Sequence, residues 1–457
     1  MTMEKNFLDS DRDDKTYNKK KRWALFLIAL CCFITNMCFS ARDGFLALFA
    51  DQHGITGYVY GLFKASYIFG YILMGFLNKK ILSWFSARCV ILFGLFGHGV
   101  CLILAAVVYT VLLQDEESSS SHNKLLFQVL TCFFQVIQGG LMSSVTLSSL
   151  SLGSAYYMDD MGKVNGTYYL GAVIPHGVVP VVANWVYNTL DGYAPPLYMF
   201  GILAFVLSTA AYVIFVTKDF DFKLDEDDKT GSISSLPYRS FIPLIQSYIL
   251  TAYLSYLQLA LPKFAAVKLG FTVVAASTPL FVLMISIAIV NVIITFFFTG
   301  NSNKILYILM LCCTMDTIAA FLIFPPNDAS AGWISTAHIL IYPLLFLIGT
   351  SDAYSTINTT PAMIFLYCTA RAREPSDNQK HTMSSLWIAG NGLSYAIGAY
   401  LAGFIDQVFR ENFHRAGMFW GSLALVCVVS LALPILSFNN TGEQYKICDN
   451  ESSSSEY

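Results

Sequence analysis

The chain has 457 residues, of which 55% are hydrophobic and only 12% are charged, whereas a soluble domain usually carries about 25% charged residues. The net charge of −3 is too small to indicate a partner class by itself. The composition excludes an ordinary soluble protein, and we expect no nucleic-acid partner.

Apolar runs recur along the whole chain, and runs of roughly 20 residues can cross a bilayer core of about 30 Å. Such runs must satisfy their backbone hydrogen bonds internally, so they are predicted to be helices. The fold class is therefore predicted to be an all-α polytopic membrane protein. In chain order, about twelve spans are expected at 23–50, 57–77, 89–113, 125–150, 164–188, 197–216, 241–269, 274–299, 305–324, 333–366, 383–409 and 416–438.

A long polar segment at 217–240 separates six predicted spans from six. We expect a tail at 1–22, a six-helix bundle at 23–216, an inter-bundle loop at 217–240, a second bundle at 241–438 and a tail at 439–457. Alternate loops together with the N-terminal tail hold twenty Lys and Arg residues, against four in the other loops. Because cytoplasmic loops are enriched in Lys and Arg, both tails and the inter-bundle loop are predicted to be cytoplasmic.

An internal repeat links the two predicted bundles. The stretches "FADQHGIT" and "AAVKLGFT" share three residues at a constant offset of 216, namely Ala50/Ala266, Gly54/Gly270 and Thr56/Thr272. Two pseudo-symmetric six-helix bundles joined by a polar loop are typical of the major facilitator fold, whose substrate site lies between the halves.

Longer stretches resemble a known family. "ARDGFLALFADQHGITGYVYGLFKASYIFGYILMGFLNKKILSWFSARCVILFG" resembles spans one to three of the vesicular amine transporter family, particularly its vesicular polyamine transporter branch. "LQLALP" and "MSSLWIAGNGLSYAIGAYLAGFIDQVF" resemble spans seven and eleven of that branch. The resemblance implies a vesicular or lysosomal transporter that exchanges a small organic cation for protons, with the plasma membrane as the other location.

Gating residues follow from the same resemblance. The segment "GFLNKKILSWFSAR" stands where facilitators have a conserved loop between spans two and three, although its acid is replaced by Asn78. Span five keeps a glycine and a proline of the antiporter motif. The predicted gating residues are Gly75, Asn78, Lys79 and Arg88 in the loop, and Gly166 and Pro180 in span five.

The amine-binding acids of the family match four positions here. They read Thr35, Gln258, Asp352 and Ile388, so only Asp352 keeps a charge. Since a carboxylate inside an apolar span is costly and usually functional, Asp352 is predicted to be the charge partner of the substrate and the proton acceptor. The alternative is a structural hydrogen bond within the bundle.

Other buried charges are candidate site residues. Arg42 and Asp43 interrupt span one, and we expect them to face a cavity, to form an outer-gate ion pair, or to snorkel to the interface. Lys64 is predicted either to pair with Asp43 or Asp316 or to snorkel. Lys263 lies close to a span end and is expected to be interfacial.

The remaining candidates are uncharged or less certain in role. Asp316 is mid-span and predicted to be buried, in a functional or a structural role. Gln258, Asn391 and Tyr169 are candidates for contacts to a cation or polar solute. A lone histidine such as His176 is more often satisfied by a neighbouring carbonyl than used in proton transfer.

The sequence therefore predicts a monomeric secondary transporter of an amine or polyamine that works by proton antiport and alternating access. Its partners would be the substrate, protons and the bilayer, with no cofactor and no metal. Two alternatives stay open: an uncoupled facilitator of a neutral or anionic metabolite, which suits Arg42 and Lys64, and a transport-inactive receptor or scaffold. An enzyme is not expected, since no nucleophile–base constellation, metal-ligand spacing or phosphate loop stands out.

Overall fold

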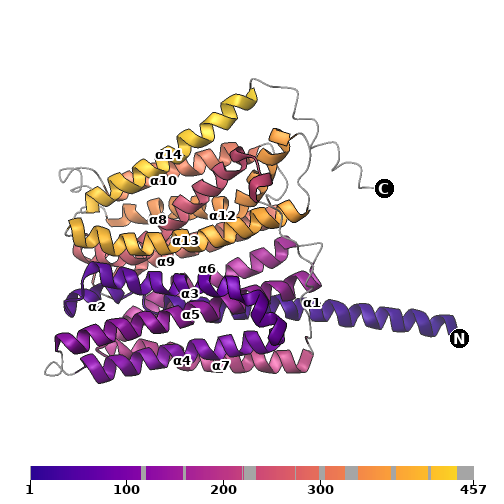
Figure 1. Cartoon of the computed structure of the whole chain (residues 1–457), viewed down its shortest axis with the longest axis horizontal. Helices are drawn as coiled ribbons and strands as arrows, with labels where there is room; N and C mark the ends of the chain where they lie inside the picture. Colours follow the sequence, from indigo (N-terminus) through magenta and orange to yellow (C-terminus); the bar gives the residue numbers. More distant parts are fainter. Residues whose placement is uncertain are drawn as a thin grey trace. The chain divides into compact units, whose positions relative to one another are not determined.

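The computed structural model describes residues 2–114, 120–157, 161–218, 220, 233–272, 274–297, 304–324, 338–371, 377–409 and 413–439. These residues form thirteen α-helices (Figure 1). The helices are α1 (Thr2–Ser40), α2 (Leu46–Gln52), α3 (Gly57–Trp84), α4 (Ala87–Leu113), α5 (Ser121–Tyr156), α6 (Met161–Thr189), α7 (Ala194–Lys218), α8 (Phe241–Val267), α9 (Thr278–Phe297), α10 (Ile305–Ile323), α12 (Ile341–Arg371), α13 (Asp377–Phe409) and α14 (Phe413–Asn439). Short 3₁₀ helices are η3 (Ile233–Ser235), η4 (Tyr238–Ser240), η5 (Ala275–Ser277) and η7 (His338–Leu340).

Nine of the helices in the described residues are long and apolar enough to cross a membrane. They are α1, α4, α5, α6, α7, α8, α9, α10 and α14. The long helices α3, α12 and α13 also coincide with predicted spans, and they carry buried polar side chains such as Lys64, Asp352 and Ser394. The prediction of an all-helical, multi-span membrane protein is confirmed.

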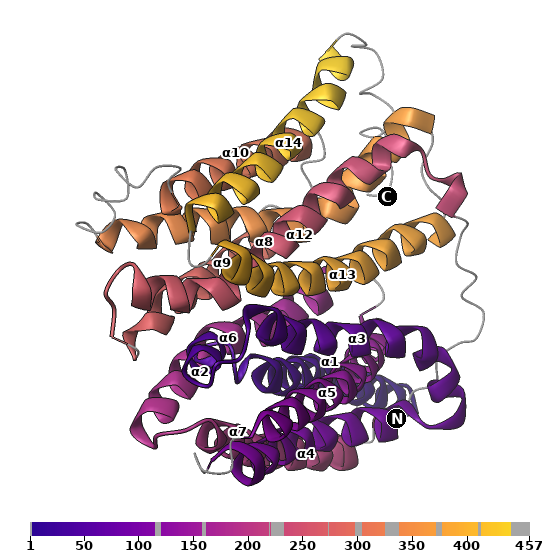
Figure 2. The same ribbon diagram turned by 60° about the vertical axis from the view of Figure 1, so that its left-hand side comes forward.

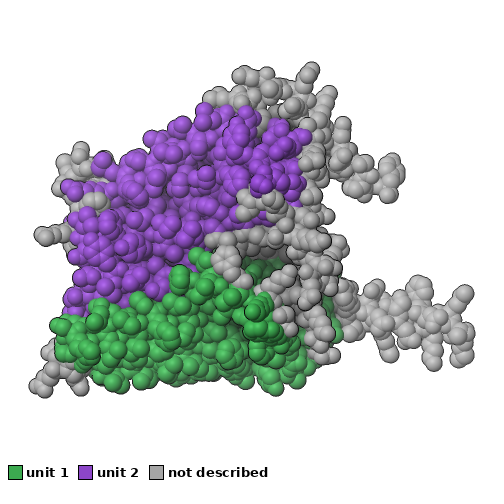
Figure 3. Space-filling view, viewed as in Figure 1, with its two compact units in different colours: residues 1–45, 69–224 green, residues 46–68, 225–457 purple. Residues whose placement is uncertain are grey.

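The chain divides into two compact units (Figure 3). Unit 1 comprises Met1–Phe45 and Phe69–Leu224, and unit 2 comprises Leu46–Ile68 and Asp225–Tyr457. The later boundary falls inside the predicted inter-bundle loop at 217–240. Unit 2 also includes α2 and the first part of α3, which precede that loop in the sequence. Most of the loop and the predicted tail beyond Asn439 lie outside the described residues.

In unit 1, α4 packs against α5 and α7, and α1 packs against α6 (Figure 2). Two glycines allow backbones to approach closely. A Cβ at Gly70 would lie 1.9 Å from the carbonyl oxygen of Val136 on α5, and one at Gly171 on α6 would lie 2.6 Å from that of Ala29 on α1. Small residues at such crossings are typical of membrane helix packing.

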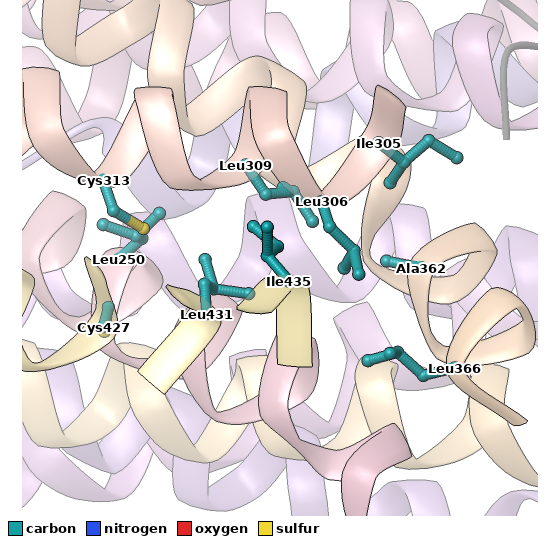
Figure 4. Close-up of a cluster of buried hydrophobic side chains, with 10 residues drawn as sticks. All are labelled: Leu250, Ile305, Leu306, Leu309, Cys313, Ala362, Leu366, Cys427, Leu431 and Ile435. Carbon is teal, nitrogen blue, oxygen red and sulfur yellow. The ribbon is translucent and has the colours of Figure 1, made fainter. Parts of the chain in front are cut away.

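In unit 2, α8 packs against α13, α10 against α14, and α12 against α9 and α10. A hydrophobic cluster joins α8, α10, α12 and α14 (Figure 4). Its buried members are Leu250, Ile305, Leu306, Leu309, Cys313, Ala362, Leu366, Cys427, Leu431 and Ile435. Because Cys313 lies one helical turn before Asp316, this cluster fixes the part of α10 that carries the acid.

The matched glycines of the repeat have the same structural role. Gly54 follows the end of α2 with φ of +64°, and Gly270 follows the end of α8 with φ of +67°. Both lie in the left-handed region that glycine adopts without strain, as is common at helix C-termini. Amides just beyond them donate back into the helices, from Ile55 to Ala50 at 2.8 Å and from Phe271 to Ala265 at 3.1 Å.

Span one differs from its prediction as a single helix over 23–50. α1 ends at Ser40, a turn occupies residues 41–45, and α2 begins at Leu46. Within the turn, the amide of Asp43 donates to the carbonyl of Ser40 at 3.0 Å. Asp and Gly favour turns because the Asp side chain competes for backbone groups and Gly is flexible, so "ARDG" ends the helix despite its apolar flanks.

The predicted gating loop between spans two and three is also mostly helical. α3 continues through Gly75 and Asn78 to Trp84, and α4 begins at Ala87, which leaves two residues between them. Ser86 caps α4 by accepting a hydrogen bond from the amide of Cys89 at 3.3 Å. An N-cap serine of this kind marks the true start of the next helix.

Candidate functional site

Two buried acids lie on neighbouring helices of unit 2. Asp316 on α10 is 1% exposed and Asp352 on α12 is 8% exposed, and α10 packs against α12. The hydroxyl group of Ser351 donates a hydrogen bond to Oδ2 of Asp316. The other oxygen, Oδ1, is buried and accepts no hydrogen bond from the described residues. The two carboxylates are close enough for their charges to interact.

Asp352 is buried within α12, one residue beyond the serine that binds Asp316. A carboxylate removed from water needs a cation, a proton or a polar partner. Asp352 can therefore bind a cation or accept a proton.

Three aromatic side chains accompany the acids. Tyr253 and Tyr256 on α8 and Trp420 on α14 have ring centroids 5.4 to 6.5 Å apart, and each is at most 3% exposed. Tyr253 is near enough to Asp316 to respond to its charge. The hydroxyl of Tyr253 and the indole nitrogen of Trp420 are buried and make no hydrogen bond to the described residues. We call Asp316, Asp352 and these three rings the acid–aromatic cluster.

The aromatic members were not among the sequence candidates, because tyrosine and tryptophan inside apolar spans usually serve packing. A signal was present: residues three apart share one face of a helix, so Tyr253 and Tyr256 had to face the same neighbour. Trp420 lies more than 160 residues further along the chain. Its place beside them depends on how α14 packs against α8.

Side-chain hydrogen bonds connect α8 to α12 and α13. The amide oxygen of Asn391 on α13 accepts hydrogen bonds from Ser247 at 3.3 Å and Thr251 at 3.2 Å. Gln246 donates to Ser355 on α12 at 3.3 Å. The oxygen of Asn391 is therefore used in helix packing. By contrast, the amide oxygen of Gln258 is buried and accepts no hydrogen bond from the described residues.

Unit 1 holds the remaining polar candidates. His176 on α6 lies 3.1 Å from the amide oxygen of Asn36 on α1. Tyr169 is partly exposed and lies edge-on to Tyr168, 5.8 Å between centroids. Gly166 and Pro180 both lie within α6.

Three charged candidates from the first two predicted spans are buried. Arg42, Asp43 and Lys64 are each 2% exposed, so the snorkelling alternative is wrong for Arg42 and Lys64. Their long side chains end inside protein rather than at an interface.

Lys263, which was expected to be interfacial, is buried and forms an ion pair. It is 4% exposed, and its Nζ donates to Asp51 on α2, 2.9 Å from Oδ2 and 3.2 Å from Oδ1. Its burial follows from the packing of α2 against α8, which pairs two segments far apart in the sequence.

Of the predicted gating residues on α3 and α4, Asn78 is 3% exposed, and its amide oxygen accepts no hydrogen bond from the described residues. Gly75 is exposed and Arg88 is partly buried, while the side chain of Lys79 lies outside the described part of the chain.

The long apolar helices define a multi-span membrane protein. Residues 25–374 match the family model of the Major Facilitator Superfamily, and the chain belongs to that superfamily. It is a secondary transporter of a small molecule rather than an enzyme.

Solved structures support the same fold. A crystal structure of a single-residue mutant of the nucleoside transporter NupG matches with a TM-score of 0.59 at 15% identity, covering 90% of this chain and 99% of that chain. A crystal structure of NupG without that substitution matches with a TM-score of 0.58 at 15% identity, covering 90% and 98%. No curated protein matches the chain. At this identity the likeness concerns the fold alone.

Proposed function

We propose that the protein exchanges a small organic cation, an amine or polyamine, for protons by alternating access. Asp352 serves as the charge partner of the substrate and as the proton acceptor, and Asp316 is the second acid of the same site. Amine binding at one face releases a proton there, and amine release at the opposite face is coupled to proton uptake. Both termini are cytoplasmic in this proposal, and a vesicular or lysosomal membrane follows from the resemblance to the vesicular amine transporters.

The observation that carries the proposal is the acid–aromatic cluster. A cation over an aromatic face gains about 0.5–2 kcal/mol, more when it is desolvated. Asp316 offers a buried oxygen that accepts no hydrogen bond from the described residues. The hydroxyl group of Tyr253 and the indole nitrogen of Trp420, whose rings pack together, make no hydrogen bond to the described residues either. A protonated amine supplies the positive charge and N–H groups that can donate to Oδ1 of Asp316 and to the hydroxyl oxygen of Tyr253, whereas Trp420 contributes its aromatic face.

Competition between amine and proton for the acids provides the coupling. Two buried carboxylates on neighbouring helices resist simultaneous ionisation, so one of them readily holds a proton. A bound ammonium group favours the ionised form of both and displaces that proton. Exchange then needs no additional titratable group.

A second candidate function is facilitated transport of an anionic or neutral metabolite. Buried Arg42 favours it, because a cation in unit 1 suits an anionic solute. This candidate predicts uptake that ignores a pH gradient and the charge of Asp352.

The test is uptake of labelled spermidine and a panel of monoamines into proteoliposomes with an imposed pH gradient. Asp352→Asn keeps the size of the side chain and removes its charge, and Asp191→Asn, at an exposed acid between α6 and α7, is the matched control. We expect gradient-driven uptake in the wild type and the control, and its loss in Asp352→Asn. Uptake that is insensitive to both the gradient and Asp352→Asn would favour the metabolite facilitator. No uptake by folded protein would overturn the amine proposal.

A further inference from the structure

Four basic residues stand in a row where the membrane-spanning part of α1 begins. They are Lys19, Lys20, Lys21 and Arg22, and the apolar span extends over Lys19–Ser40. The sequence has no acidic residue between Asp14 and Asp43. Because the run directly precedes a long apolar stretch, it lies at the boundary between the hydrocarbon core and the lipid headgroups.

A lysine of α7 reaches the same boundary. The apolar span of α7 ends at Lys218, and α1 packs against α7 within unit 1. Nζ of Lys218 lies 5.3 Å from the centroid of the Trp23 ring on α1, which is close enough for a cation–π contact. Lys218 and the basic run of α1 therefore lie at the same end of unit 1.

Aromatic contacts hold the end of α7 in place. Phe220, two residues after Lys218, is 1% exposed. Its ring lies edge-on to that of Tyr156 at the end of α5, with 5.5 Å between the centroids, and edge-on to that of Phe215 at 6.2 Å. The backbone that carries Lys218 is thus fixed by packing.

Lys19 and Lys20 share a helix face with Trp23. They precede it by four and three residues, and neighbours at these spacings lie on one side of a helix, whereas Arg22 lies about 100° around the helix from Trp23. Lys19 is exposed and Lys20 is partly exposed. We call Lys19, Lys20, Lys218 and the ring of Trp23 the basic–aromatic patch. None of its three cations forms an ion pair with a described residue.

We infer that the basic–aromatic patch binds the headgroup of an anionic phospholipid. Lysine N–H groups from two helices can donate charge-assisted hydrogen bonds to one phosphate, and an indole ring suits the headgroup level of a bilayer. Each basic residue near an anionic membrane surface contributes about fivefold in affinity. The side on which α1 begins is predicted to be cytoplasmic, and the cytoplasmic leaflet carries anionic lipids.

An exposed ring next to the patch favours a lipid over a soluble phosphate. Phe26, one turn further along α1, is 52% exposed, and its ring centroid lies 5.7 Å from that of Trp23. The acyl chain of a bound lipid can pack on this ring, whereas a soluble phosphate has no apolar part to bury there. Exchange of amine for protons does not require this patch, so the inference goes beyond the proposed function.

The experiment measures lipid binding to the full-length protein in a neutral detergent. Dioctanoyl phosphatidylserine is titrated while the midpoint of thermal unfolding is recorded, because a ligand that binds only the folded state raises that midpoint in a saturable way. Dioctanoyl phosphatidylcholine is the neutral reference, and inorganic phosphate tests for a soluble ligand. Lys20→Gln and Lys218→Gln each remove one charge of the patch. Arg22→Gln removes the neighbouring charge on another face, and Lys304→Gln, at an exposed lysine of unit 2, is the distant control.

We expect a saturable rise with phosphatidylserine that shrinks at high salt. The apparent affinity should be about fivefold weaker in Lys20→Gln and in Lys218→Gln, with a smaller loss in Arg22→Gln and none in Lys304→Gln. Equal losses in Arg22→Gln and Lys20→Gln would indicate diffuse charge attraction and overturn the inference. No rise in the wild type, an equal rise with phosphatidylcholine or inorganic phosphate, or an unchanged affinity in Lys218→Gln would overturn it too. If Lys218→Gln does not fold, an unchanged affinity in Lys19→Gln would have the same consequence.

Discussion

Replacing Asp51 with Asn is expected to destabilise the protein by leaving Lys263 less compensated. Nζ of Lys263 lies 2.9 Å from Oδ2 of Asp51. The side chain of Asp51 is 46% exposed, whereas that of Lys263 is 5% exposed. At an effective dielectric constant of about 20, a pair at this separation attracts by about 6 kcal/mol. Water around the half-exposed carboxylate and the cost of burying the lysine remove most of that gain, which leaves about 1–2 kcal/mol.

A double-mutant cycle isolates this value. The free energy of unfolding is measured for the wild type, Asp51→Asn, Lys263→Met and the double variant, at low and high salt. We expect a coupling energy of about 1–2 kcal/mol that persists in salt, because buried pairs are screened less than exposed ones. Lys268→Met, at an exposed lysine just beyond α8, is the control and is expected to be nearly neutral.

A coupling energy within about 0.3 kcal/mol of zero, the range of additivity for independent sites, would refute this reasoning. It would mean that Asp51 contributes no more than an exposed acid. The packing of α2 against α8 would then rest on apolar contacts alone.

Substitutions at four further positions are expected to act on stability or binding. Gly54→Ala and Gly270→Ala should each lower the free energy of unfolding by about 1–2 kcal/mol, because the added Cβ meets no atom but the positive φ is unfavourable for alanine. Asn at either position should cost less, and equilibrium unfolding of all four variants checks this. Gly390→Ala should cost at least about 1–3 kcal/mol, since its Cβ would lie 1.8 Å from the ring of Tyr248, and a smaller residue at 248 should restore part of it in a double-mutant cycle. Ser351→Ala removes the donor to Asp316, so stability should fall by about 1–3 kcal/mol and spermidine affinity, measured by equilibrium dialysis, should change with it.

Apolar run length predicted the helices well. The span expected at 89–113 is α4 at Ala87–Leu113, and the span expected at 305–324 is α10 at Ile305–Ile323. Hydropathy alone did not detect the turn at residues 41–45, because its apolar neighbours outweigh two charges in any window. The Asp-Gly pair within it was the available signal.

The repeat was informative about local structure and less so about contacts. Equal spacing indicated that Gly54 and Gly270 are equivalent, and both cap helices in the same conformation. It did not indicate that Asp51 pairs with Lys263, since residues 212 positions apart meet only through tertiary packing.

In the candidate site, too, burial could be predicted from the sequence and contacts between helices could not. The burial of Asp316 and Asp352 followed from their apolar surroundings in the sequence. Their proximity to each other and to Trp420 depends on which faces of α8, α10, α12 and α14 meet. Helical periodicity could not fix those faces, because these helices are apolar on nearly every side.

The most direct test of the account is proton movement caused by substrate. Proteoliposomes that contain the protein and an internal pH indicator are given spermidine in the absence of an imposed gradient, and the internal pH is followed alongside labelled uptake. The account predicts an outward proton flux that accompanies amine entry and is lost in Asp352→Asn. Amine entry without any change of internal pH would contradict it.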